Sequence, residues 1–192
     1  NEIMTIDSFE IYVGGLPQTR KKPFEYKAPF SPVDVIEEYT RPARYVENGH
    51  VIVREPLTDS EFLEFDHIGT LESFNSDGLR SIIFTMPHIK KINVKGQEVS
   101  PLDFTSKILF KEWKLGETEA ELTVMRVTVK GTNDKGVEET VVYNLYDEYD
   151  PKTQTSSMAR TTGYTATAAA NLFLEGLFTE KGVFPPELIG KH

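Results

Sequence analysis

Three short segments of the chain combine residue types that can hold an anion. Gly14-Gly15-Leu16 closes an alternating run of residues, and its glycines let backbone N–H groups approach a ligand carboxylate or phosphate closely. Arg80 comes after a glycine turn, and its planar guanidinium can clamp a carboxylate through two parallel hydrogen bonds. Arg160-Thr161-Thr162-Gly163 lies at the start of a predicted helix, where the positive end of the helix dipole favours an anion.

Each of these segments also has a purely structural interpretation. The glycines can form a plain turn, and Arg80 can make a surface or interdomain salt bridge. Thr161 or Thr162 can simply cap the helix. The residues alone leave both interpretations open, and they assign no catalytic residue.

Several common site chemistries are missing from the sequence. There is no cysteine, no G-x-S-x-G nucleophile elbow, and no glycine-rich phosphate loop of the G-x-G-x-x-G or Walker A type. The acidic turn 147–150 lacks the glycine and the ligand spacing of an EF-hand. We therefore expect no bound metal, because metal-ligand spacing is also absent among the four histidines, His50, His67, His88 and His192.

Composition limits the class of protein. The chain has 192 residues, which is enough for one domain with its own core. Its formal net charge of −9 argues against a nucleic-acid partner or an anionic membrane surface. No apolar stretch approaches the ~20 residues that cross a bilayer, and no basic-then-apolar leader opens the chain. We expect a cytoplasmic protein, since the absence of cysteine is compatible with a reducing compartment.

Local signals predict the elements that must position these segments. The run 1–13 alternates as a strand does, and it starts without methionine, so we expect the chain to be part of something longer. Hairpins are predicted over 43–54, around Asn48-Gly49, and over 122–146, around a turn at 131–136. Helices are predicted from Ser31-Pro32 to Pro42, from Ser100-Pro101 to Trp113, and from Ala159 to Glu175, with Gly176 at the end.

These elements define a fold class. Short turns join antiparallel neighbours, so we predict an α+β domain with a mixed, mostly antiparallel sheet and helices on one face. The basic run Arg20-Lys21-Lys22 is interpreted as part of a solvated loop.

Taken in order, the motifs resemble the saccharopine dehydrogenase family over residues 9–187. The segment S-M-A-R-T-T-G-Y, residues 157–164, is the most specific of them. The others are F-E-I-Y-V-G-G-L-P (9–17), F-S-P-V-D-V-I-E-E-Y (30–39), E-N-G-H (47–50), G-T-L-E-S-F-N-S-D-G-L-R-S (69–81), D-F-T-S-K-I-L-F (103–110), L-T-V-M-R-V-T-V (122–129) and E-K-G-V-F-P-P-E (180–187).

The resemblance implies a single catalytic and dimerisation domain over residues 1–192, similar in fold to the C-terminal domain of glyceraldehyde-3-phosphate dehydrogenase. Relatives carry a Rossmann domain before it that binds NAD or NADP, and that domain is absent here. The implied function is substrate binding and homodimerisation in an NAD(P)-dependent oxidoreductase that acts on the C–N bond of an amino acid such as saccharopine or lysine. On its own, the domain is expected to bind no cofactor and to be inactive.

The same resemblance implies roles for individual residues. Arg80 falls where the family has an arginine that grips a substrate carboxylate. Gly14, Gly15 and Leu16 match the glycine loop beside the substrate and cofactor cleft. Arg160, Thr162 and Gly163 match the start of a late helix that returns towards the Rossmann domain in relatives, which gives them a positioning role.

The sequence departs from the family between Pro87 and His88, where relatives carry a T-L-R-Y-P-G-H type segment. We hypothesise that this segment is missing from the sequence rather than from the protein. If it is truly absent, the substrate site is damaged, and the competing interpretation is a non-catalytic scaffold that kept the fold. Within the enzyme class, lysine 6-dehydrogenase and carboxynorspermidine synthase of the same superfamily stay open as well.

Overall fold

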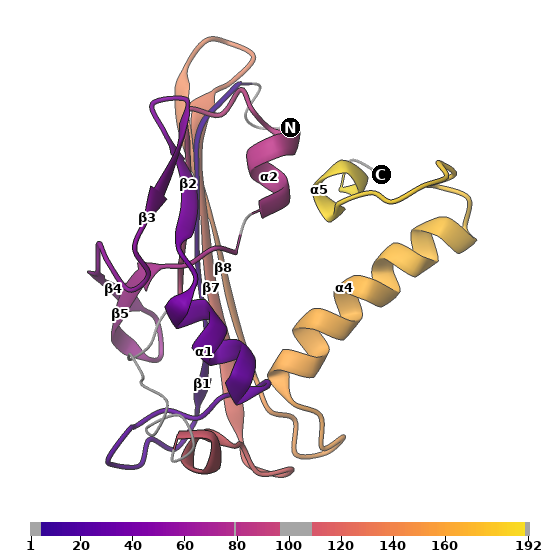
Figure 1. Ribbon diagram of the computed structural model, residues 1–192. Helices are drawn as coiled ribbons and strands as arrows, with labels where there is room; N and C mark the ends of the chain where they lie inside the picture. Colours follow the sequence, from indigo (N-terminus) through magenta and orange to yellow (C-terminus); the bar gives the residue numbers. More distant parts are fainter. Residues whose placement is uncertain (1–4, 79, 97–108, 191–192) are drawn as a thin grey trace.

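The computed structural model describes residues 5–78, 80–96 and 109–190. Over these residues the chain builds one eight-stranded sheet with the path β3-β2-β6-β1-β7-β8, and the β4–β5 hairpin joins it through β6 (Figure 1). In chain order the elements are β1 (Thr5–Pro17), α1 (Pro32–Thr40), β2 (Ala43–Glu47), β3 (His50–Arg54), β4 (Glu61–Phe65), β5 (Gly69–Asn75), α2 (Arg80–Thr85), β6 (Lys91–Gly96), β7 (Glu121–Thr132), β8 (Glu138–Glu148), α4 (Ser157–Leu174) and α5 (Pro186–Ile189). The predicted α+β class is confirmed.

Strand β1 lies in the middle of the sheet. It pairs in parallel with β6 and antiparallel with β7, and Gly15 lies opposite Thr123. The strand continues to Pro17, so Gly14-Gly15-Leu16, which we predicted to follow the strand as a loop, lies inside it. Alternation of side chains ends at the glycines, but backbone pairing does not need side chains, and β7 supplies partners as far as Glu121.

The local signals at the β2–β3 turn, at the start of α1 and at the end of α4 are confirmed, whereas the predicted helix start at Ser100-Pro101 lies outside the described residues. Asn48 and Gly49 adopt positive φ values of 52° and 78° at the β2–β3 turn, as a type I′ turn requires. Helix α1 begins at Pro32, directly after its N-cap Ser31. Gly176 has φ 72° just beyond α4, where a left-handed residue commonly ends a helix.

One face of the sheet carries the main core. Tyr12 and Leu16 of β1 point to this face together with Val124 of β7. They pack against Val35 of α1, the indole of Trp113 and the β4–β5 hairpin. The side chains that fill this core are aromatic or branched, and most are less than a tenth exposed.

Among the residues that the structure describes, the opposite face is covered only at its two ends. At one end, Ile83 of α2 packs against Val46 and Phe9. At the other end, the first turn of α4 lies on β7. Helices therefore lie on both faces, where we expected them on one. The middle of this face is apolar and half-exposed, and we call it the open face; it comprises Ile11, Val13, Met125, Val127, Tyr143 and Leu145.

Helix α4 points away from the sheet over most of its length (Figure 1). Tyr164 and Leu174 are 66% and 78% exposed, so the helix presents apolar side chains to solvent. The chain then turns back, and α5 lies beside α2, where the hydroxyl of Thr85 donates to Glu187 at 2.8 Å. Within the described residues, no helix is long and apolar enough to cross a membrane.

Candidate functional site

Arg80 is held at the start of α2 by a buried carboxylate. Its Nε donates to Oδ2 of Asp77 at 2.8 Å, and the Asp77 side chain is only 2% exposed. Arg44 of β2 grips the same carboxylate through Nε at 3.1 Å and Nη2 at 2.9 Å. The Arg80 side chain itself is 47% exposed, and in the described part of the chain its two terminal nitrogens have no partner. This geometry fixes the guanidinium and leaves its outer pair of N–H donors available for a second carboxylate.

The two arginines control the ionisation of Asp77. Burial acts to raise the pKa of Asp77, but the hydrogen bonds from Arg44 and the charges of Arg44 and Arg80 outweigh it. The net result is a pKa below the ordinary value. Asp77 therefore stays ionised at neutral pH, as a group that positions two cations must.

We expect Asp77→Asn to lower the free energy of unfolding by about 1–2 kcal/mol at pH 7, because charge-assisted hydrogen bonds are lost while both arginines keep access to water. The pKa of Asp77 is depressed in the folded state, so its stabilisation is full above the unfolded value of about 3.9. It is lost as the pH falls through the folded value. Urea unfolding from pH 7 to pH 3 checks this, and a difference between variant and wild type that does not shrink in acid contradicts it.

A second polar cluster fixes the first turn of α4 to the sheet. The buried hydroxyl of Ser157 bonds the Thr123 hydroxyl at 2.9 Å and the carbonyl oxygen of Asp147 at 3.0 Å. The Ser157 backbone N–H donates to Oε1 of Glu121. Ser156 is the N-cap, with its hydroxyl accepting from the Ala159 N–H at 3.1 Å. The helix thus begins two residues before the predicted start.

The predicted α4 residues differ in what they contact. Arg160 turns back to β8, where its Nη2 donates to Oδ1 of Asp147 at 2.6 Å and to the carbonyl oxygen of Glu148. Neither threonine caps the helix: Thr161 bonds the Ser157 carbonyl oxygen at 3.0 Å, and Thr162 contacts the Met158 sulfur. Arg160 therefore ties α4 to the sheet.

Glu121 was not anticipated from the sequence. It is fully buried beneath α4, and burial raises its pKa despite hydrogen bonds from the Ser157 and Met158 N–H groups. The charge of Asp147 raises it further, whereas Arg160 lowers it. A glutamate at the start of a strand carries no sequence signal for burial, because the partner N–H group lies 36 residues away.

Gly15 is required by close packing rather than by backbone conformation. A Cβ built on it would lie 2.5 Å from Cγ of Pro29 and 3.0 Å from Cε of Met158. The missing side chain therefore lets Pro29 and the first turn of α4 approach the end of β1. A ligand role for Gly14, Gly15 and Leu16 stays a prediction.

Alanine substitutions at two glycines of the predicted site, Gly15 and Gly163, are expected to change stability in opposite directions. Gly15→Ala overpacks the contact with Pro29 and Met158 and should lower the free energy of unfolding by about 1–3 kcal/mol. Gly163→Ala is the matched control, because nothing lies within 4 Å of its Cβ and alanine favours helix by about 0.8–1.0 kcal/mol. Thermal and urea unfolding measure both. Equal effects of the two substitutions would show that packing at Gly15 is not limiting.

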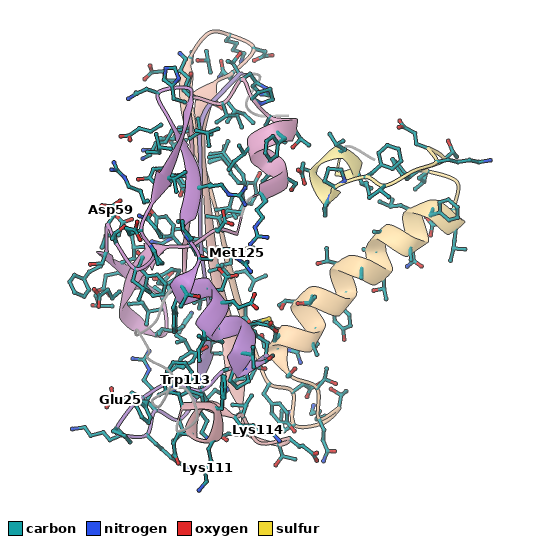
Figure 2. All side chains as sticks on the ribbon, in the orientation of Figure 1. Glu25, Asp59, Lys111, Trp113, Lys114 and Met125 are labelled. Atoms are coloured by element: carbon teal, nitrogen blue, oxygen red, sulfur yellow. The ribbon has the colours of Figure 1, made fainter. Side chains whose placement is uncertain are left out.

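The open face lies on the same side of the sheet as both clusters. Register places Met125 on the same face as Thr123 beneath α4, and Figure 2 shows it on the sheet between α2 and the start of α4. No group of three or more potential metal-ligating side chains occurs among residues 5–78, 80–96 and 109–190. The fold and the site therefore define an α+β domain that presents a fixed guanidinium on the same side of the sheet as its apolar open face.

The chain belongs to the saccharopine dehydrogenase family. The family model that matches is described as the saccharopine dehydrogenase C-terminal domain, and it covers residues 1–93 and 68–192. A curated relative, carboxyaminopropylagmatine dehydrogenase of Synechocystis sp., is 24% identical over 190 residues, covering 82% of this chain and 48% of the relative. The chain thus spans about half the length of this relative.

A solved structure shows the same fold. It is apo histidine-tagged saccharopine dehydrogenase (L-Glu forming) from Saccharomyces cerevisiae, with a TM-score of 0.71 and 14% identity. The match covers 95% of this chain and 62% of the yeast chain. The resemblance to the saccharopine dehydrogenase family drawn from the motifs is therefore confirmed, and the family supports an oxidoreductase.

Proposed function

We propose that this domain binds the substrate of an NAD(P)-dependent oxidoreductase that acts on the C–N bond of an amino acid. The observation that carries the proposal is the guanidinium of Arg80, fixed by buried Asp77 with its outer donors exposed, on a helix that lies on the same side of the sheet as the open face. Such a group binds a carboxylate in one orientation, and the neighbouring apolar surface accommodates an alkyl chain. An amino acid offers both features.

The chain itself does not fit a dinucleotide cofactor. It contains no glycine-rich phosphate loop that would cradle a pyrophosphate. Family membership implies a Rossmann domain in the full-length protein, and we propose that NAD or NADP binds there. Residues 1–192 would then supply the substrate contacts. The exposed apolar residues of α4, including Tyr164 and Leu174, would pack against the Rossmann domain.

The full-length protein tests the activity. We expect nicotinamide reduction or oxidation, followed at 340 nm, with at least one of saccharopine, lysine or a carboxyalkylated polyamine, and none from residues 1–192 alone. The carboxyalkylated polyamines are included because the curated relative is named for carboxyaminopropylagmatine. The carboxyalkylated polyamines also test for a carboxynorspermidine synthase activity, and lysine tests for a lysine 6-dehydrogenase activity. Absence of turnover with all of these compounds favours the non-catalytic scaffold. Turnover by residues 1–192 alone contradicts the proposal that the cofactor binds in a separate Rossmann domain.

We further propose that the β7–β8 side of the open face pairs two copies of the chain as a homodimer. Tyr143 is 59% exposed there, next to half-buried Leu145 and Val127. A contiguous apolar surface of this kind is typical of a protein–protein interface. We also propose that the dimer is cytoplasmic, in keeping with the lack of cysteine.

Tyr143→Glu tests the dimer in the full-length protein. The added charge should raise the dissociation constant of the dimer at least tenfold, the equivalent of about 1.4 kcal/mol. Val142→Glu is the control, because Val142 has a comparable exposure of 48% on the opposite face of the same strand. Light scattering after size-exclusion chromatography measures both variants. A monomeric wild type, or an equal effect of the two variants, contradicts the interface.

A further inference from the structure

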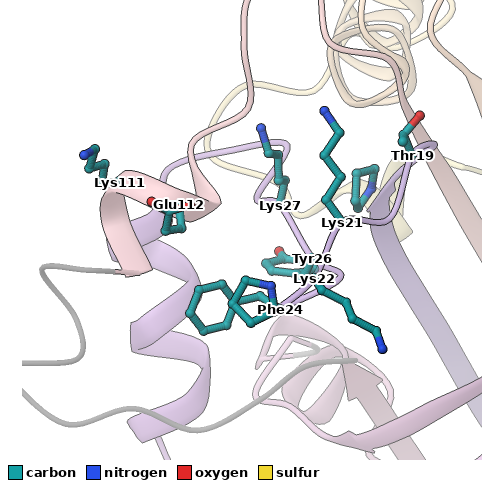
Figure 3. A pocket seen from close by; sticks show the side chains of 10 residues that line it. Thr19, Lys21, Lys22, Phe24, Tyr26, Lys27, Lys111 and Glu112 are labelled. Atoms are coloured by element: carbon teal, nitrogen blue, oxygen red, sulfur yellow. The ribbon is translucent and has the colours of Figure 1, made fainter.

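The loop after β1 forms a basic groove away from Arg80. A cavity of about 230 Å³ opens there, lined by Lys21, Lys22, Lys27, Lys111, Phe24 and Thr19 among others (Figure 3). Lys111 comes from a different part of the chain, so the cavity is built between two segments rather than within one loop. Figure 2 shows Lys111 and Trp113 at this end of the molecule.

The charge of the groove contrasts with that of the chain. Four lysines and one glutamate, Glu112, line it; Glu119 lies beside it, and Glu25 is on the loop after β1. Lys27 pairs with Glu119 at 2.5 Å. Burial acts to raise the pKa of Glu119, but Lys27, the Gly116 N–H and the charge of Lys21 outweigh it and lower the pKa. The groove therefore keeps a surplus of positive charge in a chain of net charge −9.

Three of the four lysines, Lys21, Lys22 and Lys27, lie on an ordered loop. Phe24 and Tyr26 pack edge-on against Trp113, with ring centroids 6.4 and 5.3 Å apart. The Ala28 N–H donates to the Trp113 carbonyl oxygen at 2.8 Å, and the Glu25 N–H donates to that of Lys21 at 2.9 Å. We interpreted the basic run as a solvated loop, and its cations are indeed exposed, but the backbone that carries them is fixed by aromatic packing.

Two of the ammonium groups, those of Lys21 and Lys27, point to the same side of the groove, whereas Lys22 points to the other side (Figure 3). In the described part of the chain, Lys22 and Lys111 have no ion pair. Lysine is a point charge with three donors, which suits the oxygens of a phosphate, and Phe24 offers an apolar wall to the rest of a ligand. Clustered like charges repel one another and destabilise the folded protein, and a bound anion would offset this repulsion.

We propose that this groove binds a small phosphate-bearing molecule. Its volume is below the ~300–1,000 Å³ of pockets for drug-sized ligands, which restricts the ligand to about the size of pyrophosphate or a short organophosphate. The phosphate can come from a free molecule or from the nicotinamide cofactor held by the neighbouring domain. The site does not depend on the substrate role proposed for Arg80.

Calorimetric titration of the full-length protein with inorganic pyrophosphate, with and without saturating NADPH, tests the groove. We expect Lys21→Gln with Lys111→Gln to weaken pyrophosphate binding at least tenfold. The double control Lys135→Gln with Lys152→Gln removes the same charge from exposed turns outside the groove and should change binding less than twofold. Circular dichroism and thermal unfolding verify that both double variants stay folded.

Each outcome decides the proposal. Binding that persists with NADPH and is lost in the groove variant supports a free phosphate ligand. Binding that NADPH abolishes, together with weaker NADPH binding by the groove variant, also supports the groove and identifies the cofactor as the source of the phosphate. Equal binding by the groove and control variants overturns the proposal, and so does no binding at about 10 mM pyrophosphate, ten times the ~1 mM dissociation constant of a weak contact.

Discussion

Replacing Arg80 by alanine in the full-length protein is expected to lower kcat/KM for the proposed amino-acid substrate by about 10–150-fold. This range corresponds to one charge-assisted hydrogen bond of about 1.5–3 kcal/mol. The loss should appear mainly in KM, because a carboxylate remote from the reacting C–N bond is bound equally in the ground state and the transition state. The free energy of unfolding should change little, since Arg44 still holds Asp77 through two bonds.

Two further variants separate binding from positioning. Arg80→Lys keeps the positive charge but loses the planar fork, so KM should rise less than in the alanine variant but remain above wild type. Arg44→Ala leaves Arg80 and Asp77 paired and should affect stability more than KM. Steady-state kinetics with varied substrate measure all three variants. An unchanged KM in Arg80→Ala would mean that Arg80 has only a structural role, and it would favour a non-catalytic scaffold.

Replacing Glu121 by alanine is expected to lower the free energy of unfolding by about 2–4 kcal/mol. The variant leaves the buried N–H of Ser157 without its acceptor, which costs about 1–3 kcal/mol, and it opens a cavity beneath α4. Because this contact fixes the first turn of α4, catalytic activity in the full-length protein should fall as well. Urea unfolding with intrinsic fluorescence measures the loss.

Glu121→Gln is the matched control, since it keeps an acceptor for the Ser157 N–H and removes the buried charge. The pKa of Glu121 is raised in the folded state, so its ionisation reduces stability as the pH rises from the unfolded value of about 4.3 through the folded value. The glutamine variant escapes this loss and should match or exceed wild type at pH 7, with the advantage disappearing at pH 4. A glutamine variant as unstable as the alanine variant would contradict burial of the charge as the cause.

Local sequence signals were sufficient for much of the fold. Asn48-Gly49 specified its hairpin because a type I′ turn needs two positive φ angles, and Ser31-Pro32 and Gly176 marked helix ends for equally local reasons. The sheet order was beyond such signals. The parallel pairing of β1 with β6 joins residues more than 80 positions apart, and no local pattern encodes it.

The sequence alone could identify a site residue only where the residue type itself indicates its chemical role. Arg80 could be selected because a guanidinium after a glycine turn has a recognisable use. Arg44, Asp77 and Glu121 could not, because their roles come from burial and because the pairs Arg44–Asp77 and Glu121–Ser157 join residues 33 and 36 positions apart. For Arg160 the residue type was misleading. Its position at a helix start suggested a bound anion, whereas in the folded chain its guanidinium pairs with the carboxylate of Asp147.

The central position of β1 has a consequence for the order in which the protein folds during synthesis. Its main partner, β7, begins at Glu121, more than a hundred residues after β1 ends at Pro17. At roughly 5–20 residues per second, a ribosome needs about 5–20 seconds to deliver that partner. During this interval one edge of β1 lacks its final neighbour, and the other edge lacks it until β6 at Lys91–Gly96 has been made; unpaired strand edges are common starting points of aggregation. The nascent chain is therefore a natural client for chaperones that cover extended segments, and its yield should depend on them.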